Sequence, residues 1–123
     1  MPEDFDDTGW SNGLAELGYG DAVPSRDYNP ERTVVRFGPQ ASNKYITTYF
    51  RHAFTVTDPT AFTNLIVRLL RDDGAVVYLN GTEIFRDNIR NNPVLYDTLA
   101  IFLLPDTGTV YLQTNASPAL RSA

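Results

Sequence analysis

The chain contains no cysteine, only one histidine, and no hydrophobic run near the about 20 residues of a membrane-spanning helix. Without thiols, neither a disulfide framework nor a thiolate metal site can form. With His52 as the only histidine, zinc sites that need two histidines are excluded as well. Acidic residues outnumber basic ones by 15 to 10, and the basic residues form no cluster. We therefore expect no nucleic-acid partner and no membrane insertion.

The 123 residues include many that favour strands and turns. Seven tyrosines, seven phenylalanines and one tryptophan accompany eight glycines and eight prolines. No window carries a convincing helical period; only Glu16 and the turn at residues 59–62 are candidates for a short helix. The length fits a single domain with one core. We expect an irregular wrapping loop at residues 1–32, strands within residues 33–115 and a tail at residues 116–123.

The best-defined local signal is a hairpin centred on Asn80-Gly81. Both residues tolerate positive φ, which a two-residue type I′ turn requires, and apolar runs flank the pair at residues 75–79 and 83–85. A second turn, Asp72-Asp73-Gly74, separates this hairpin from another apolar run at residues 65–70. The pattern predicts an antiparallel meander of three strands.

Other segments predict further strands around the meander. Residues 33–37 and 45–56 alternate with period two, and the second of these is the longest strand candidate. Residues 99–104 and 110–114 predict a final hairpin. Six to eight antiparallel strands around one core indicate an all-β fold, specifically a β-sandwich or jelly roll.

Three linked motifs resemble an accessory domain of bacterial proteins: Leu17–Asp21, Lys44–Arg51 and Asp72–Gly81. The domain is a galactose-binding-like jelly roll appended to secreted metallophosphoesterases, other hydrolases and cell-surface proteins, and it is related in shape to carbohydrate-binding modules. The resemblance covers roughly residues 4–100. It implies a non-catalytic module, part of a larger secreted or surface protein, that binds a glycan or a cell-envelope polymer. The chain itself shows no signal peptide at its start.

The resemblance ends near residue 100, where related domains continue through several more strands. A jelly roll without those strands leaves backbone donors and acceptors unpaired along a sheet edge. Either residues 101–115 substitute for them or another chain supplies them. We therefore expect a homo-oligomer formed through the open edge, and self-association of a truncated domain is an alternative function.

Candidate ligand-binding residues follow from the chemistry of sugar recognition, in which flat rings stack on the sugar while polar side chains bond its hydroxyls. The candidates are exposed aromatic residues and the polar groups near them: Tyr45, Tyr49, Arg51, Tyr19, Tyr28 and Asp73. For the loop tyrosines the alternative is that the rings plug the ends of the sandwich.

Four aspartates near the start of the chain are candidate metal ligands, because Ca²⁺ takes six to eight oxygens. These are Asp4, Asp6, Asp7 and Asp21. Jelly rolls that the chain resembles often hold a structural calcium. The spacing matches no calcium-loop motif, so a solvated acidic terminus is the alternative.

Catalytic candidates are few. They are His52, which falls between two phenylalanines on the apolar parity of its strand, and the turn residues Asp72 and Asp73, for which turn chemistry is the alternative role. No nucleophile elbow accompanies them. A small hydrolase of esters or phosphoesters, dependent on a metal or on an interface cleft, is thus a second alternative function.

Overall fold

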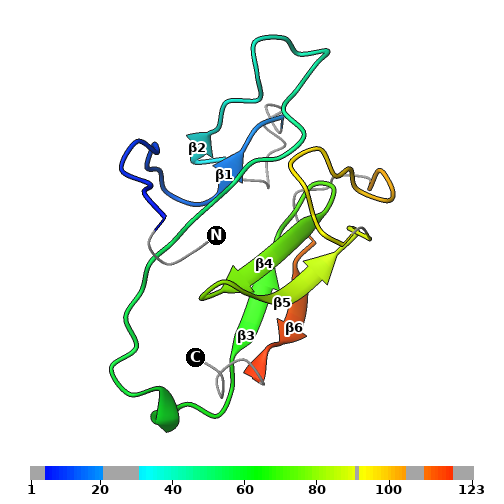
Figure 1. The fold of residues 1–123 in the computed structure, drawn as a ribbon. Coiled ribbons are helices and arrows are strands. Elements are labelled where there is room, and N and C mark those ends of the chain that lie inside the picture. Colours follow the sequence, from blue (N-terminus) through cyan, green and yellow to red (C-terminus); the bar gives the residue numbers. More distant parts are fainter. Residues whose placement is uncertain (1–4, 21–30, 91, 105–109, 118–123) are drawn as a thin grey trace. The chain divides into compact units, whose positions relative to one another are not determined.

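A computed structural model describes residues 5–20, 31–90, 92–104 and 110–117 (Figure 1). Its regular structure consists of six short strands and one 3-10 helix, η1 (Pro59–Ala61), within the described residues. The all-β class is therefore confirmed, while the jelly-roll sandwich stays a prediction. Two compact units make up the chain, one of them Asp4–Ile46 and the other including Thr47–Ala123. We call them the N-terminal unit and the C-terminal unit.

The N-terminal unit contains a two-stranded parallel sheet. Strand β1 (Leu17–Gly18) pairs with β2 (Thr33–Val34), with Leu17 opposite Thr33. The pair is extended by a backbone hydrogen bond of 2.9 Å from the Val35 N–H to the Gly18 carbonyl. Strand β1 lies in the segment that the sequence predicts as an irregular loop, and β2 covers only the first part of the strand predicted at residues 33–37.

The predicted hairpin at Asn80-Gly81 is confirmed. Strand β4 (Ala75–Leu79) pairs antiparallel with β5 (Thr82–Asp87), and Leu79 lies opposite Thr82 (Figure 1). The turn residues Asn80 and Gly81 have φ values of 47° and 78°. Both φ values are positive, as a type I′ turn requires, and this turn matches the twist of the two strands.

A β-bulge in β5 changes which side chains share a face of the hairpin. Val77 lies opposite Phe85 but Tyr78 lies opposite Glu83, so Ile84 is an extra residue on β5. Residues three apart in a regular strand point to opposite faces. The extra residue restores a common face for Glu83 and Arg86, which form two hydrogen bonds of 2.8 and 2.6 Å.

The predicted three-stranded meander is wrong at its first strand. Strand β3 (Ile66–Leu69) pairs antiparallel with β6 (Leu112–Asn115), not with β4. Ile66 lies opposite Asn115 and Leu69 opposite Leu112. The pair is closed at one end by bonds from the Ala116 N–H to the Leu65 carbonyl (2.8 Å) and from the Leu65 N–H to the Ser117 hydroxyl (3.0 Å). Strand β3 therefore pairs with the distant β6 and not with β4, the next strand along the chain.

Two other predicted strands are absent. Residues 45–56, the longest strand candidate, and residues 99–104 contain no strand residue. The hairpin predicted from residues 99–104 and 110–114 is accordingly wrong, because the second of these segments contributes β6, which pairs with β3. Its predicted turn at residues 106–108 lies outside the described residues. The predicted short helix at residues 59–62 is confirmed as η1.

Burial in the described part of the chain is limited. Ala116, 5% exposed, is its only buried hydrophobic residue, and most apolar side chains of the hairpin are half-buried. Many large apolar side chains are exposed, including Leu103, Val34, Leu99 and Phe102. No described helix is both long and apolar enough to cross a membrane.

Candidate functional site

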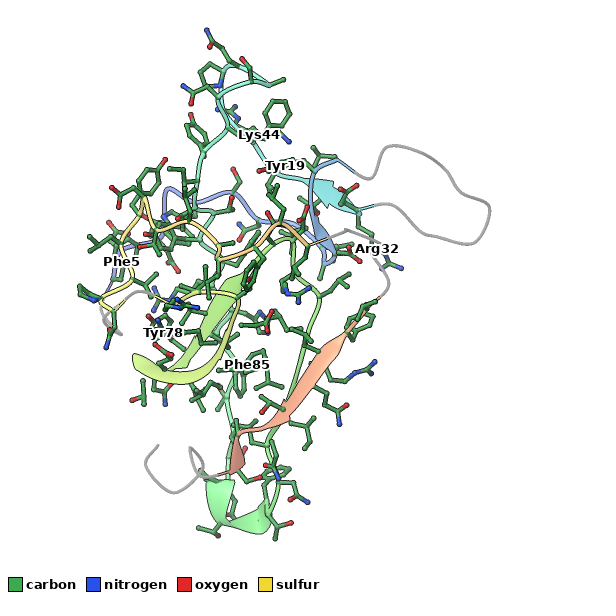
Figure 2. The ribbon with its side chains drawn as sticks, turned by 90° about the vertical axis from the view of Figure 1, so that its right-hand side faces the viewer. Phe5, Tyr19, Arg32, Lys44, Tyr78 and Phe85 are labelled. Carbon is green, nitrogen blue, oxygen red and sulfur yellow. The ribbon has the colours of Figure 1, made fainter. Side chains whose placement is uncertain are left out.

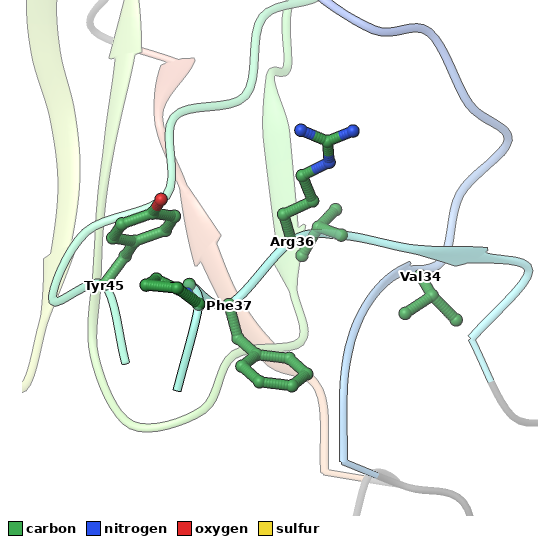
Figure 3. Close-up of a pocket in the computed structure, with 7 residues that line it drawn as sticks. Val34, Arg36, Phe37 and Tyr45 are labelled. Carbon is green, nitrogen blue, oxygen red and sulfur yellow. The ribbon is translucent and has the colours of Figure 1, made fainter. Parts of the chain in front are cut away.

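The N-terminal unit has an open hollow of about 480 Å³ on its surface. Its walls come from one run of chain and from a tyrosine beside it, as Figure 3 shows. The lining residues are Val34, Val35, Arg36, Phe37, Gly38, Pro39 and Tyr45. The Tyr45 side chain is 48% exposed, so part of its ring is available to a ligand. A hollow lined by a half-exposed ring and by an arginine suits recognition of a flat apolar face that carries hydroxyl groups.

The turn that follows β2 brings Tyr45 to this hollow. Gly38 has a φ of 119°, which a residue with a side chain rarely adopts, and Pro39 follows it. Beyond the turn, the Asn43 N–H donates to the Gln40 carbonyl (3.1 Å), and the Tyr45 N–H donates to the Phe37 carbonyl (2.8 Å). The last bond fixes the backbone of Tyr45 beside that of Phe37.

A cluster of two rings and one cation adjoins the hollow through Phe37. The Tyr19 and Phe37 ring centroids are 5.3 Å apart, and the Lys44 Nζ lies 4.8 Å from the Tyr19 centroid and 5.9 Å from that of Phe37. Figure 2 shows the Tyr19 and Lys44 side chains close together. Cation–π attraction holds the ammonium over the rings. Tyr19 is therefore half-buried and supports the wall of the hollow, and it does not line the hollow itself.

The other predicted ligand-binding residues do not all belong to the same unit. Tyr45 belongs to the N-terminal unit, whereas Tyr49 and Arg51 belong to the C-terminal unit. Tyr49 is 52% exposed, but Phe50, on the face predicted to meet the core, is 54% exposed, so the two predicted faces are not distinguished. Tyr28 lies outside the described residues. Tyr45 is thus the predicted residue that the structure assigns to a hollow.

Asp73 holds two segments of the C-terminal unit together. Its Oδ1 accepts a hydrogen bond of 2.8 Å from the Leu104 N–H, and its carbonyl accepts one of 3.2 Å from the Asn88 side-chain amide. These bonds support a structural role for Asp73. Asp72 beside it is exposed. The ligand-binding and catalytic roles of the two aspartates stay predictions.

Asn88 is the residue whose importance the sequence did not reveal. It follows β5 directly and has a φ of 56°. Its Nδ2 donates to the Phe102 carbonyl (2.7 Å) as well as to Asp73, and its Oδ1 accepts from the Phe102 N–H (3.1 Å). Its own carbonyl accepts from the Ile101 N–H (2.8 Å). One asparagine thus imitates a short strand and holds residues 101–102 against the end of the hairpin.

Asp6 and Asp7, the candidate calcium ligands among the described residues, lie in turns. Asp6 Oδ1 accepts bonds from the Thr8 hydroxyl (2.7 Å) and the Thr8 N–H (3.0 Å), and these bonds lower the pKa of Asp6. Asp7 accepts at its carbonyl from the Trp10 N–H (2.9 Å). The predicted calcium ligands Asp4 and Asp21 lie outside the described residues. Within the described ranges, no group of three or more histidine, cysteine or acidic side chains is arranged to hold a metal ion.

His52 lies on an extended part of the C-terminal unit, next to an aromatic ring. Its ring stacks on that of Phe54, with centroids 6.3 Å apart and an interplanar angle of 19°. Residues two apart share a side of an extended chain, which explains the contact. The predicted core-facing strand position of His52 is not observed, because residues 45–56 form no strand and both His52 and Phe54 are exposed. Its candidate catalytic role stays a prediction.

Comparisons with family models, with curated protein sequences and with solved structures found no match for this chain.

Proposed function

We propose that the chain is a non-catalytic binding module that recognises a glycan or a cell-envelope polymer through the hollow of the N-terminal unit. The single observation that carries this proposal is the hollow itself, which is lined by both the half-exposed Tyr45 and Arg36. Sugars present C–H faces that stack on aromatic rings and hydroxyl groups that accept hydrogen bonds from a guanidinium. The resemblance to galactose-binding-like accessory domains supports the same ligand class and a secreted or cell-surface location.

The surroundings of the hollow favour a saccharide over an apolar ligand. Arg36 is exposed, and the Lys44 ammonium lies near the Phe37 ring that forms one wall. Gln40 and Asn43, both exposed, add amide groups on the loop that returns the chain to Tyr45. A small number of polar groups around an apolar surface fixes the orientation of a bound molecule and provides specificity.

A matched pair of tyrosine substitutions tests the proposal. Tyr45→Ala removes the ring from the hollow, whereas Tyr49→Ala removes a ring of similar exposure that lies in the C-terminal unit. Affinity for polysaccharides is measured by titration calorimetry after a glycan array has selected ligands. We expect Tyr45→Ala to weaken binding by about tenfold, since a stacked ring contributes roughly 1–2 kcal/mol. Tyr49→Ala should leave the affinity unchanged.

Two results would contradict the proposal. The first is the absence of binding to any glycan by a chain that retains its hairpin fold. The second is an equal loss of affinity in both tyrosine variants, because the ligand would then not be bound at the hollow in particular.

A further inference from the structure

The segment Thr48–Val56 of the C-terminal unit has the pattern of a strand but pairs with no strand of the described part of the chain. Four of its side chains, Tyr49, Phe50, Phe54 and Val56, are between 40% and 61% exposed. The backbone at residues 48–50 and 52–56 makes no hydrogen bond with the described residues. Backbone groups of this kind pair readily with another strand. Arg51 is the only charged side chain, and the segment contains neither proline nor glycine, the residues that most weaken a strand.

The order of side chains in this segment is nearly symmetric about His52. Phe50 and Phe54 lie two residues before and after it, and Thr48 and Val56 lie four residues before and after it. These residues share one face of an extended chain. An antiparallel pair of identical segments related by a two-fold axis requires this kind of symmetry, because residue i then meets residue j while j meets i.

We propose that Thr48–Val56 pairs antiparallel with the same segment of a second copy of the chain, with the two His52 residues opposite each other at the two-fold axis. In this register Phe50 of each copy lies opposite Phe54 of the other. Aromatic cross-strand pairs stabilise antiparallel strands, and here they form twice. Each Arg51 lies opposite the small Ala53, so the two positive charges do not face each other. The inference is independent of the proposed glycan site.

Other registers of the two segments are less favourable. A shift by one residue places the apolar face of one strand against the polar face of the other. Centring the pair on Arg51 puts two like charges directly opposite each other, which destabilises a strand pair. Centring it on Ala53 keeps the faces matched but replaces both Phe50–Phe54 pairs by pairs of phenylalanine with valine and with histidine. Only the register centred on His52 places both phenylalanines of each copy opposite a phenylalanine of the other.

The absence of cysteine allows a direct test by disulfide cross-linking, since each introduced cysteine is the only thiol in the full chain. Directly opposite residues of an antiparallel pair have Cα atoms about 4.5–5.5 Å apart, within the range of a disulfide. In the proposed register, His52→Cys meets its own copy at this distance. Ala53→Cys, the matched control, meets its copy only diagonally at about 7–8 Å, which is too far for a disulfide.

We expect His52→Cys to form a disulfide-linked dimer at micromolar concentration under mild oxidation, at a rate at least about tenfold above that of Ala53→Cys. In this pairing His52, Phe50 and Phe54 occupy non-hydrogen-bonded positions, where side chains lie closest, so the Ala53 N–H donates to the second copy. Adding Ala53→Pro to His52→Cys should then abolish the cross-link, because proline lacks this donor. Positions 52 and 53 lie outside the hairpin of β4 and β5, so the substitutions should leave the hairpin folded. Comparing the circular dichroism spectra of the variants and the unmodified chain checks that the variants fold. By sedimentation, the unmodified chain should be dimeric and Ala53→Pro monomeric.

Three results would overturn the proposal. The first is equal or faster cross-linking at position 53, which would refute the two-fold register. The second is a cross-link at position 52 that survives Ala53→Pro. The third is a monomeric mass for the unmodified chain across the micromolar range.

Discussion

Replacing Asn88 by alanine removes the side chain that joins the end of the β4–β5 hairpin to residues 101–102. Three hydrogen bonds are lost: two that Nδ2 donates to the Asp73 and Phe102 carbonyls, and one that Oδ1 accepts from the Phe102 N–H. The backbone bond from the Ile101 N–H to the Asn88 carbonyl stays possible. The substitution therefore tests the side chain and not the backbone contact.

The expected loss of stability has two parts. Each hydrogen bond contributes about 0.5–1.5 kcal/mol net, and we take the lower half of this range because the Phe102 bonds are solvent-accessible, which gives roughly 1.5–3 kcal/mol for the three. Alanine at a φ of 56° adds about 1 kcal/mol of backbone strain, since only glycine, asparagine and aspartate adopt this region readily. Asn88→Ala should thus lower the free energy of unfolding by about 2.5–4 kcal/mol.

Urea unfolding followed by tyrosine and tryptophan fluorescence measures this loss, provided that the m-value is unchanged. Asn88→Gly separates the two parts, because glycine adopts a positive φ without strain and yet makes none of the side-chain bonds. We expect Asn88→Gly to be destabilised, but by less than Asn88→Ala. The reasoning is refuted if Asn88→Gly is as stable as the unmodified chain, because the three bonds would then contribute nothing.

Local chemistry explains what the sequence predicted correctly in the fold. Asn80-Gly81 fixes the hairpin because both residues accept the positive φ that the turn requires, and no distant contact is needed. Asp58 similarly begins η1, where its carboxylate accepts bonds from the hydroxyl (2.6 Å) and the N–H (3.0 Å) of Thr60. These bonds lower the pKa of Asp58. Each element depends on residues within a few positions of one another.

Strand pairing could not be predicted in the same way. Period two shows which side chains share a face, but it does not show which segment supplies the partner strand. Residues 65–70 and 75–79 are close in sequence, and yet β3 pairs with β6 more than forty residues away. Asp73 explains part of this unexpected pairing. Its carbonyl and carboxylate oxygens accept hydrogen bonds from Asn88 and Leu104 instead of closing a tight turn from β3 to β4.

In the candidate site, too, the sequence predicted some residues and missed others. Tyr45 was identified from its outward parity and the chemistry of sugar binding, and it lines the hollow. Phe37 and Lys44 were missed, because Phe37 was assigned only to a strand and Lys44 only to a motif. A signal was available in the Gly38-Pro39 turn, which returns the chain so that residues 44–45 lie beside Phe37. A turn at Gly38-Pro39 reverses the chain, so this turn alone predicts that Lys44 and Tyr45 lie close to Phe37.

Two further predictions concern the hairpin. Gly74→Ala places a Cβ 3.1 and 3.2 Å from the Asp87 and Asn88 carbonyl oxygens and should destabilise the fold by about 1–2 kcal/mol in urea, whereas Gly9→Ala, with open space around it, should not. Arg86 lowers the pKa of Glu83 by hydrogen bonding, so this pair stabilises the fold above the unfolded-state pKa and ceases to do so as the pH falls through the lower folded-state value. The unmodified chain should therefore lose more stability on acidification than Glu83→Gln; equal pH profiles would show that the ion pair does not stabilise the hairpin.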